Sequence, residues 1–246
     1  MTNWLAVYKR ELAGYFATPV AYVFIIVFLL LAGVFTFSDR LGMLFERRQA
    51  DLQSFFLWHE WLYLFLIPAL GMRLWAEERR QGTLELLMTL PVSRLGAVLG
   101  KYLAAWSFTG VALLLTFPYW ITVNYLGAPD NGAIAAGYIG SFLMAGAFLA
   151  IAACCSAATK NQVIAFVMSA VICLGFILAG MPTVLGFFQG WAPPAVLDTI
   201  SSLSFMSNFD AIKKGVIDLR HVVFFGSLIA AALTINVLIL DAKREA

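Results

Sequence analysis

The sequence between residues 75 and 91 reads Trp75-Ala-Glu-Glu-Arg-Arg-Gln-Gly-Thr-Leu-Glu-Leu-Leu-Met-Thr-Leu-Pro91. It begins as a charged run, turns amphipathic, and lies between two long apolar runs. This alternation predicts a segment outside the bilayer in a protein that crosses the membrane several times. In such a protein we expect the segment to be a docking site.

The composition supports a membrane protein. Hydrophobic residues make up 62% of the chain and charged residues 12%, with a mean hydropathy of +0.87. An ordinary globular domain has roughly 45–50% apolar and about 25% charged residues. The chain therefore belongs in a bilayer.

Six apolar runs are long enough to be considered for crossing about 30 Å of hydrocarbon, which takes roughly 17–25 helical residues. The second run is the least regular, because His59 and Glu60 lie near one end and Arg73 near the other. Long side chains at span ends can reach the headgroups. The sequence thus predicts an all-α membrane protein with a single transmembrane domain, residues 1–246, and spans at Val20 to Phe37, Phe55 to Trp75, Tyr102 to Leu126, Ala133 to Ala158, Gln162 to Phe188 and Val222 to Leu240.

Two features predict how the spans pack. The fourth span carries small residues at four-residue intervals, which lets helix backbones approach closely, so we expect it inside the bundle. Pro68 and Pro118 lie within the second and third spans and predict kinks there. The small residues are Ala133, Gly137, Ser141 and Ala145, and then Gly146, Ala150, Cys154 and Ala158.

An even number of spans puts both termini on one side of the membrane. The termini, the loop between spans 2 and 3 and the loop between spans 4 and 5 carry Lys9, Arg10, Arg73, Arg79, Arg80, Arg94, Lys101, Lys160, Lys243 and Arg244. The opposite loops carry Arg40, Arg47, Arg48, Lys213, Lys214 and Arg220. The excess of positive charge predicts cytoplasmic termini and a multi-pass protein of the cytoplasmic membrane.

The chain opens with an amphipathic stretch in place of a cleavable signal peptide. Apolar and aromatic residues including Trp4 and Tyr8 fall on one helical face, while Lys9, Arg10 and Glu11 lie on another. This pattern favours an interfacial helix within residues 1–19. A frayed extension of the first span is the alternative.

No chemistry of catalysis is evident in the sequence. The three cysteines form no metal-binding pattern, and His59 and His221 lie at span ends. Gly96-Ala-Val-Leu-Gly-Lys101 differs from a phosphate-binding loop in its glycine spacing and in the Tyr102 that follows. We find no protease, hydrolase or proton-relay motif in the spans. We therefore expect no active site, metal or cofactor in this chain.

The segment 77–94 is the remaining candidate for function. Gly82 ends the helix that leaves the second span, Thr83 can cap a new helix, and Glu85 complements its dipole. Leu84, Leu86 and Leu87 then present an apolar face before Pro91 ends the helix. Such a helix suits either the membrane surface or a groove on a partner.

This segment, with Leu99-Gly-Lys-Tyr-Leu-Ala104, resembles the signature of ABC type-2 export permeases, the membrane subunits of ATP-binding-cassette transporters. The sequence from Leu203 to Arg220 is similar to the gliding-motility type permease subgroup. The likeness covers nearly the whole chain.

The resemblance implies a coupling helix from Gly82 to Pro91 in a cleft of a separate ATPase subunit. Glu77, Glu78 and Glu85 would lie in or beside that contact, and Trp4 to Phe16 would be an elbow helix near it. It also implies two permease copies and two ATPase subunits, with ATP and Mg²⁺ bound by the ATPase and lipid around the spans. Nucleic acid is not an expected partner.

Residues 189–221 are too polar to span and predict short helices on the outer face, which would guide substrate, bind an extracytoplasmic partner or form a passive lid. Two functions stay open. The chain is either an exporter of an unidentified substrate or a mechanotransmitter that passes ATP-driven motion to a partner without carrying a substrate.

Overall fold

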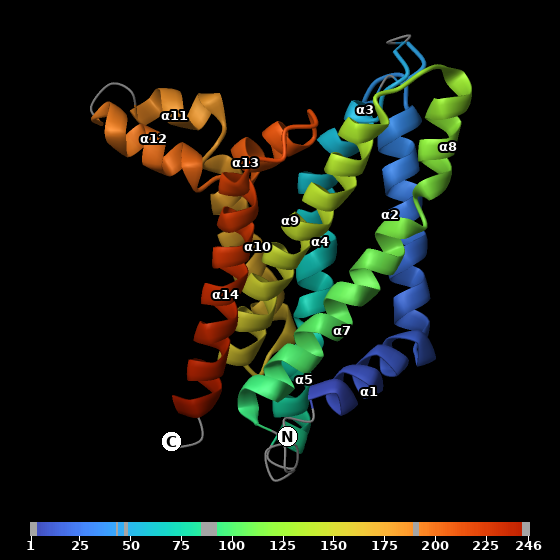
Figure 1. Cartoon of the computed structure of the whole chain (residues 1–246). Coiled ribbons are helices and arrows are strands. Elements are labelled where there is room, and N and C mark those ends of the chain that lie inside the picture. Colours follow the sequence, from blue (N-terminus) through green and yellow to red (C-terminus); the bar gives the residue numbers. More distant parts are fainter. Residues whose placement is uncertain (1–3, 43, 47–48, 85–92, 189–191, 243–246) are drawn as a thin grey trace.

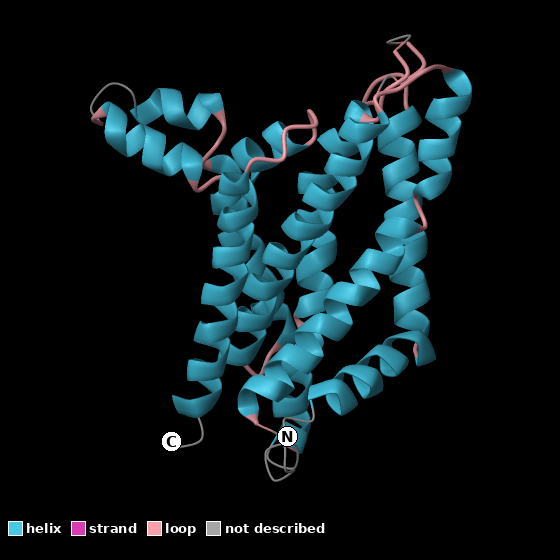
Figure 2. Cartoon of the chain, in the orientation of Figure 1, coloured by secondary structure: helices cyan, strands magenta, loops and turns pink. Residues whose placement is uncertain are grey.

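The computed structural model describes residues 4–42, 44–46, 49–84, 93–188 and 192–242 (Figure 1). Within these ranges every regular element is a helix and no strand occurs, which confirms the all-α prediction (Figure 2). The helices are α1 (Trp4–Ala17), α2 (Pro19–Phe37), α3 (Gln53–Leu57), α4 (His59–Gly71), α5 (Arg73–Gln81), α7 (Arg94–Leu114), α8 (Phe117–Leu126), α9 (Asn131–Ala158), α10 (Gln162–Leu178), α11 (Pro182–Phe188), α12 (Pro194–Ser202), α13 (Phe205–Ile212) and α14 (Leu219–Ala242).

The helices form an upright bundle whose two ends differ (Figure 1). We call the end where α1 begins and α14 ends the proximal end, and the opposite end the distal end. Helix α1 lies across the proximal end and leads into α2, so it is not part of a span. Helix α1 is thus not a continuous extension of α2.

Four stretches are helical, long and apolar enough to cross a membrane: Pro19–Phe37, Arg94–Leu126, Asn131–Ala158 and Leu219–Ala242. They correspond to four of the six expected spans. The expected second span is divided among α3, α4 and α5, and α10 ends at Leu178, earlier than predicted. Pro182 accounts for the early end, because in a continuing helix it would have no amide hydrogen for the Leu178 carbonyl and its ring would clash with that carbonyl.

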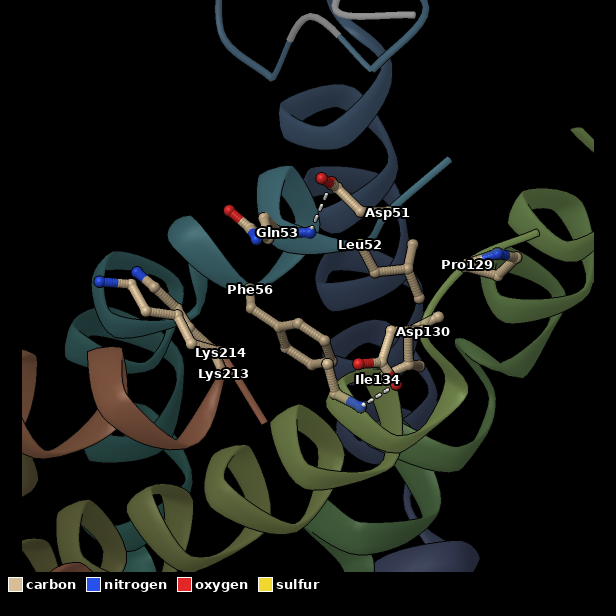
Figure 3. A pocket seen from close by; sticks show the side chains of 10 residues that line it. Asp51, Leu52, Gln53, Phe56, Pro129, Asp130, Ile134, Lys213 and Lys214 are labelled. Atoms are coloured by element: carbon tan, nitrogen blue, oxygen red, sulfur yellow. Dashed lines mark hydrogen bonds between the residues drawn. The ribbon is translucent and has the colours of Figure 1, made fainter. Parts of the chain in front are cut away.

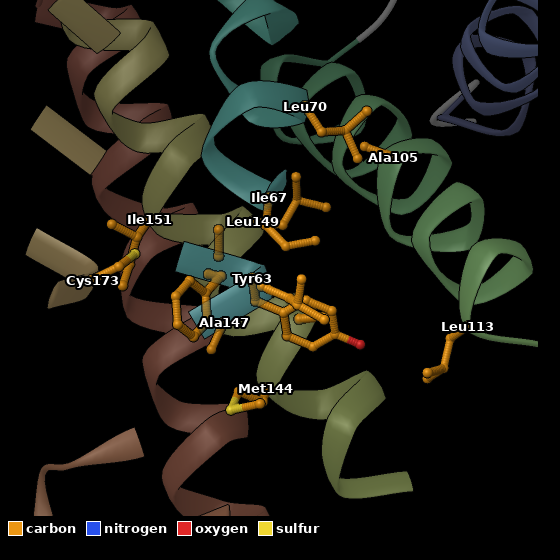
Figure 4. Close-up of a cluster of buried hydrophobic side chains, with 14 of the residues drawn as sticks. Tyr63, Ile67, Leu70, Ala105, Leu113, Met144, Ala147, Leu149, Ile151 and Cys173 are labelled. Carbon is orange, nitrogen blue, oxygen red and sulfur yellow. The ribbon is translucent and has the colours of Figure 1, made fainter. Parts of the chain in front are cut away.

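Helix α9 lies at the centre, as its small residues predict. It packs against α4, α7, α10 and α14, and 78% of its apolar window is buried. A Cβ atom at Gly146 would lie 2.8 Å from the Trp106 ring, so only glycine allows this approach. Figure 4 shows the resulting core, with buried side chains from α4, α7, α9 and α10.

Both predicted proline kinks coincide with helix breaks. Helix α4 contains Pro68 and ends at Gly71, so that α5 starts after Met72. Helix α7 stops at Leu114, and Pro118 lies in the first turn of α8. A proline lacks the amide hydrogen that a helix interior needs, which accounts for breaks near these positions.

His59 and Glu60, near one end of the expected second span, are buried, with exposed fractions of 0% and 2%. The His59 ring nitrogen Nδ1 lies 2.7 Å from the hydroxyl of Ser141 on α9, and the same hydroxyl lies 2.7 Å from the Tyr63 hydroxyl. Aromatic rings, among them Phe55 and Phe56, cover the imidazole.

The distal end is closed by short helices, as expected for the segment 189–221. Helix α12 has no buried residue, whereas α13 inserts Phe205, Phe209 and Ile212 into the bundle. The Phe205 ring stacks on Phe148 of α9 at 4.7 Å between centroids. Residues 189–191 of this segment lie outside the described residues.

Candidate functional site

A buried lysine joins three helices at the proximal end. Lys101 on α7 is 3% exposed, and its Nζ lies 2.8 Å from Glu78 Oε1 on α5 and 3.2 Å from Glu11 Oε1 on α1. The same nitrogen lies 5.3 Å from the centre of the Trp75 ring, within the range of a cation–π contact. We call Lys101, Glu11 and Glu78 the Lys101 cluster.

A glycine makes this cluster sterically feasible. A Cβ atom at Gly100 would lie 2.8 Å from both the carbonyl oxygen of Trp4 and Cβ of Val7. Helix α1 therefore touches the α7 backbone beside Lys101. Any larger residue at position 100 would push α1 away and lengthen the contact between Lys101 and Glu11.

Other contacts hold α1 along α7. The Tyr8 hydroxyl donates to Ser107 Oγ at 3.1 Å, and the Tyr15 ring stacks on Phe108 at 5.2 Å. Of the predicted elbow residues, Trp4 packs its ring edge against Tyr8 at 6.4 Å. Lys9 and Arg10 are exposed, as the amphipathic pattern predicts.

Charge explains how Glu11 stays ionised. Burial alone would raise the pKa of the Glu11 carboxyl, but the charges and hydrogen bonds of Lys101 and Arg10 hold its pKa below the ordinary value. Arg10 lies 2.7 Å from the same carboxylate oxygen. Glu78 is less completely paired, because its Oε2 is buried without a hydrogen-bond partner in the described part of the chain.

The helix that carries Glu78 ends as the sequence predicts. Gly82 caps α5 with φ of +70°, a left-handed conformation that glycine adopts without steric cost. Glu77 is paired within this last turn, accepting hydrogen bonds from Arg80 at 2.8 Å and Gln81 at 2.6 Å. The bond from Arg80 lowers the pKa of Glu77.

The structure places only the start of the predicted coupling helix. Thr83 and Leu84 are again helical, and the Thr83 hydroxyl donates to the Glu78 carbonyl at 3.4 Å. Four predicted contact residues, Glu85, Leu86, Leu87 and Pro91, lie outside the described residues.

A serine from the central helix stabilises the break before α5. Ser156 Oγ accepts hydrogen bonds from the backbone nitrogens of Trp75 and Ala76, each at 3.0 Å, and donates to the Met72 carbonyl at 2.7 Å. Amide groups in the first turn of a helix have no carbonyl partner within that helix. Ser156 therefore supplies the hydrogen-bond acceptor that the amides of Trp75 and Ala76 lose at the break. Arg79 adds a hydrogen bond to the Ala157 carbonyl at 2.8 Å.

The chain after the predicted coupling helix is also anchored. Ser93 caps α7 by accepting from the Gly96 amide at 3.1 Å. Arg94 forms an ion pair with Asp241 near the end of α14. Both flanks of residues 85–92 are therefore connected to the bundle, through Glu78 on one side and Arg94 on the other.

The sequence did not identify Lys101 or Ser156 as site residues. A lysine directly before an apolar run usually reaches the interface, and a serine in a small-residue helix usually serves close packing. Gly100, next to Lys101, was a local signal. It indicates a close helix contact once α1 is known to lie against α7 at this glycine.

The arrangement connects helices of the bundle through ion pairs and hydrogen bonds. In the described residues, no group of three or more His, Cys, Asp or Glu is placed to hold a metal ion. Instead, ionic and backbone contacts tie the two ends of one polar segment to α1, α7, α9 and α14.

Comparison with known proteins agrees with this organisation. No curated protein matches the chain. The family model described as ABC-2 family transporter protein matches residues 23–240, which is most of the chain. Members of this family are permease components rather than catalytic subunits and normally work with an ABC ATPase partner. The chain is therefore a multi-pass membrane protein of the ABC-2 transporter family, the membrane permease component of an ABC transporter.

Proposed function

We propose that this permease couples ATP hydrolysis by a separate ATPase subunit to export of a substrate, and that the Lys101 cluster transmits the motion. The observation that carries the proposal is the contact of one buried ammonium group with Glu11 and Glu78. Glu78 lies four residues before Gly82, where the proposed coupling helix begins.

Movement of the coupling helix would reach the bundle by two routes. A displacement at Gly82 acts on α5 and, through Glu78 and Lys101, on α7 and α1. A displacement at Ser93 acts on α7 directly and on α14 through Arg94 and Asp241. Buried contacts transmit such shifts because packed interfaces move between discrete arrangements.

The assembly that we propose has two permease copies and two ATPase subunits, which bind ATP and Mg²⁺. Glu77, Thr83, Leu84, Glu85, Leu86, Leu87 and Pro91 would form or border the ATPase contact. The proximal end would face the cytoplasm, in line with the positive-inside rule, and the protein would lie in the bacterial cytoplasmic membrane with six crossings. Membership of the gliding-motility type subgroup stays a prediction from residues 203–220.

The six crossings would use α4–α5 and α10 in addition to the four long apolar stretches. Figure 1 supports this count, because α4 and α10 both run along the bundle between its proximal and distal ends. Mechanotransmission without a substrate remains the alternative, and the family match does not favour it.

The first test is affinity purification of the tagged permease from native membranes in mild detergent, followed by mass spectrometry. Wild type is compared with a Gly82→Pro, Glu85→Lys double variant. We expect an ABC ATPase with wild type and its loss with the double variant. The matched control is Asp198→Lys, which reverses a charge on exposed α12 at the distal end and should retain the ATPase.

Two results would contradict the proposal. Wild-type permease that is intact but carries no ATPase would leave the coupling helix without a partner. Equal recovery of the ATPase with wild type and the double variant would show that docking does not use this segment. A second preparation, with Lys101→Met, separates docking from transmission: it should retain the ATPase but lose the stimulation of ATP hydrolysis by the permease.

A further inference from the structure

A small cavity opens at the distal end, between the start of α4 and α13. Its volume is about 260 Å³, and its lining includes Trp58, Glu60, Trp61, Asp210 and Lys213. Ligand pockets that enclose a drug-sized molecule are usually about 300–1,000 Å³. This cavity is therefore suited to one polar group of a larger molecule or to a very small ligand.

Glu60 is the unusual group in this lining. Its exposed fraction is 2%, and no hydrogen bond or ion pair to its carboxylate occurs among the described residues. A buried carboxylate without a partner is costly, and an ionisable residue at membrane depth is most often functional. A cation that entered the cavity would supply the missing partner.

The rest of the lining favours a ligand with both charges. Lys213 is mostly buried and pairs with Asp210, and its charge also acts on the Glu60 carboxyl, so a positive group lies near Glu60. The buried indole nitrogen of Trp58 has no hydrogen-bond acceptor in the part of the chain that the structure describes. An ammonium group suits Glu60 and the faces of Trp58 and Trp61, whereas a phosphate suits Lys213 and the indole N–H.

We propose that this cavity binds the ammonium–phosphate headgroup of a zwitterionic phospholipid, with the ammonium at Glu60 and the phosphate at Lys213. The same headgroup chemistry occurs in soluble phosphoethanolamine. An apolar track favours the lipid: Leu57, Trp61 and Phe65 follow at four-residue intervals, and Leu57 and Phe65 are 42% and 59% exposed. An acyl chain can lie along this stripe while the headgroup occupies the cavity.

A neighbouring cavity of about 180 Å³ shares Lys213 but is a weaker candidate (Figure 3). Its carboxylates already have partners. Asp51 accepts a hydrogen bond from the Gln53 amide at 3.1 Å, and Asp130 accepts from the Gly132 and Ala133 amides at 2.9 and 3.1 Å. Of these two cavities, the one beside Glu60 combines a carboxylate that has no hydrogen bond or ion pair among the described residues with a lysine and two indoles.

The test is native mass spectrometry of the purified full-length permease with phosphatidylethanolamine and phosphatidylglycerol of identical acyl chains. We expect wild type to prefer phosphatidylethanolamine by about tenfold, the effect of one hydrogen bond to a charged group. Glu60→Gln should abolish the preference, and Lys213→Gln should weaken binding of both lipids. Asp198→Asn, on exposed α12, is the matched control and should change neither.

Equal binding of the two lipids to wild type would overturn the proposal, as would an unchanged preference in Glu60→Gln. If Glu60→Gln does not fold, as judged by gel filtration, the phosphate contact is still tested by whether Lys213→Gln weakens binding of both lipids. Displacement of the lipid by equimolar phosphoethanolamine would refute the lipid assignment in favour of a soluble ligand. The measurement needs no ATPase, so its outcome is separate from that of the coupling proposal.

Discussion

Lys101 on α7 bonds Glu78 on α5, with 2.8 Å between Nζ and Oε1, although the two residues lie on different helices and on opposite sides of the predicted coupling helix. The bond spans the polar segment that contains the predicted coupling helix. Helices α5 and α7 are consequently connected twice, by the chain through residues 82–93 and by this ion pair. Any rearrangement of the segment must either preserve the bond or break it.

We predict that Lys101→Met destabilises the permease by about 2–3 kcal/mol. Removing one partner of a buried ion pair typically costs about 3–5 kcal/mol, and the partial exposure of Glu11 and Glu78, near 20% each, reduces that cost. The free energy of unfolding in mixed micelles, titrated with a denaturing detergent, measures the change.

A triple variant provides the control for that prediction. Lys101→Met, Glu11→Gln and Glu78→Gln together leave no buried unpaired charge in the cluster, since Arg10, which loses its partner Glu11, is exposed, so most of the lost stability should return. Coupling should not return, because the ionic connection is absent in both proteins. A triple variant as unstable as Lys101→Met would show that packing of the lysine, rather than its charge, matters.

Gly82→Ala should cost about 1 kcal/mol through backbone conformation alone. No heavy atom lies within 4 Å of a Cβ built at Gly82, but its φ of +70° is unfavourable for alanine. Gly14→Ala is the matched control, since its Cβ also meets no atom and Gly14 is helical; it should stabilise the protein by about 0.5–1 kcal/mol. Equal effects of the two substitutions in the same unfolding assay would exclude strain at Gly82.

Ser156→Ala should destabilise the protein by about 2 kcal/mol, because it removes the partner of two backbone amides and one carbonyl at the α4–α5 break. Hydrogen exchange at Trp75 and Ala76 should become faster. The control is Ser169→Ala: Ser169 is equally buried, but its hydroxyl bonds only carbonyls of its own helix, so its loss should cost less. Unchanged exchange at Trp75 would refute the role of Ser156.

The pH dependence of the free energy of unfolding should show the stabilisation that ionised Glu11 contributes. Its pKa is lower in the folded state than the ordinary value of 4.5, so the folded protein binds the proton less readily than the unfolded chain. The stabilisation is complete above pH 4.5 and is lost as the pH falls through the folded-state pKa. Glu11→Gln should reduce this acid-dependent loss, whereas Glu46→Gln, at an exposed site, should leave it unchanged.

The fold was predictable where the signal, such as apolar length or residue spacing, lies within the sequence of a single helix. Apolar length identified α2, α9 and α14, and small residues at four-residue intervals placed α9 in the centre. The break at Met72 was harder to locate, because it depends on a hydroxyl from Ser156 as well as on Pro68 four residues earlier. A contact between residues so distant in sequence leaves no local pattern.

The candidate site was predictable in the same partial way. The end of α5 needs a residue with left-handed backbone, and the glycine at position 82 indicates such a residue in the sequence. The amphipathic pattern of α1 likewise indicated that one face of this helix is covered. Lys101 was counted among the positive charges flanking a span and lay within the family-like stretch Leu99 to Ala104, but it was not predicted to join helices. Its role arises from three helices that converge on Gly100, and convergence of this kind is a property of the tertiary structure.

The stacking of Tyr15 on Phe108 has a consequence for biosynthesis. Helix α1 leaves the ribosome well before α7, so the aromatic face that Phe108 covers in the finished protein is at first without its partner. The bilayer interface can hold this face until the third apolar stretch inserts. Nascent chains arrested before residue 94 should thus keep α1 on the membrane surface, and its transfer to α7 would mark a late step of assembly.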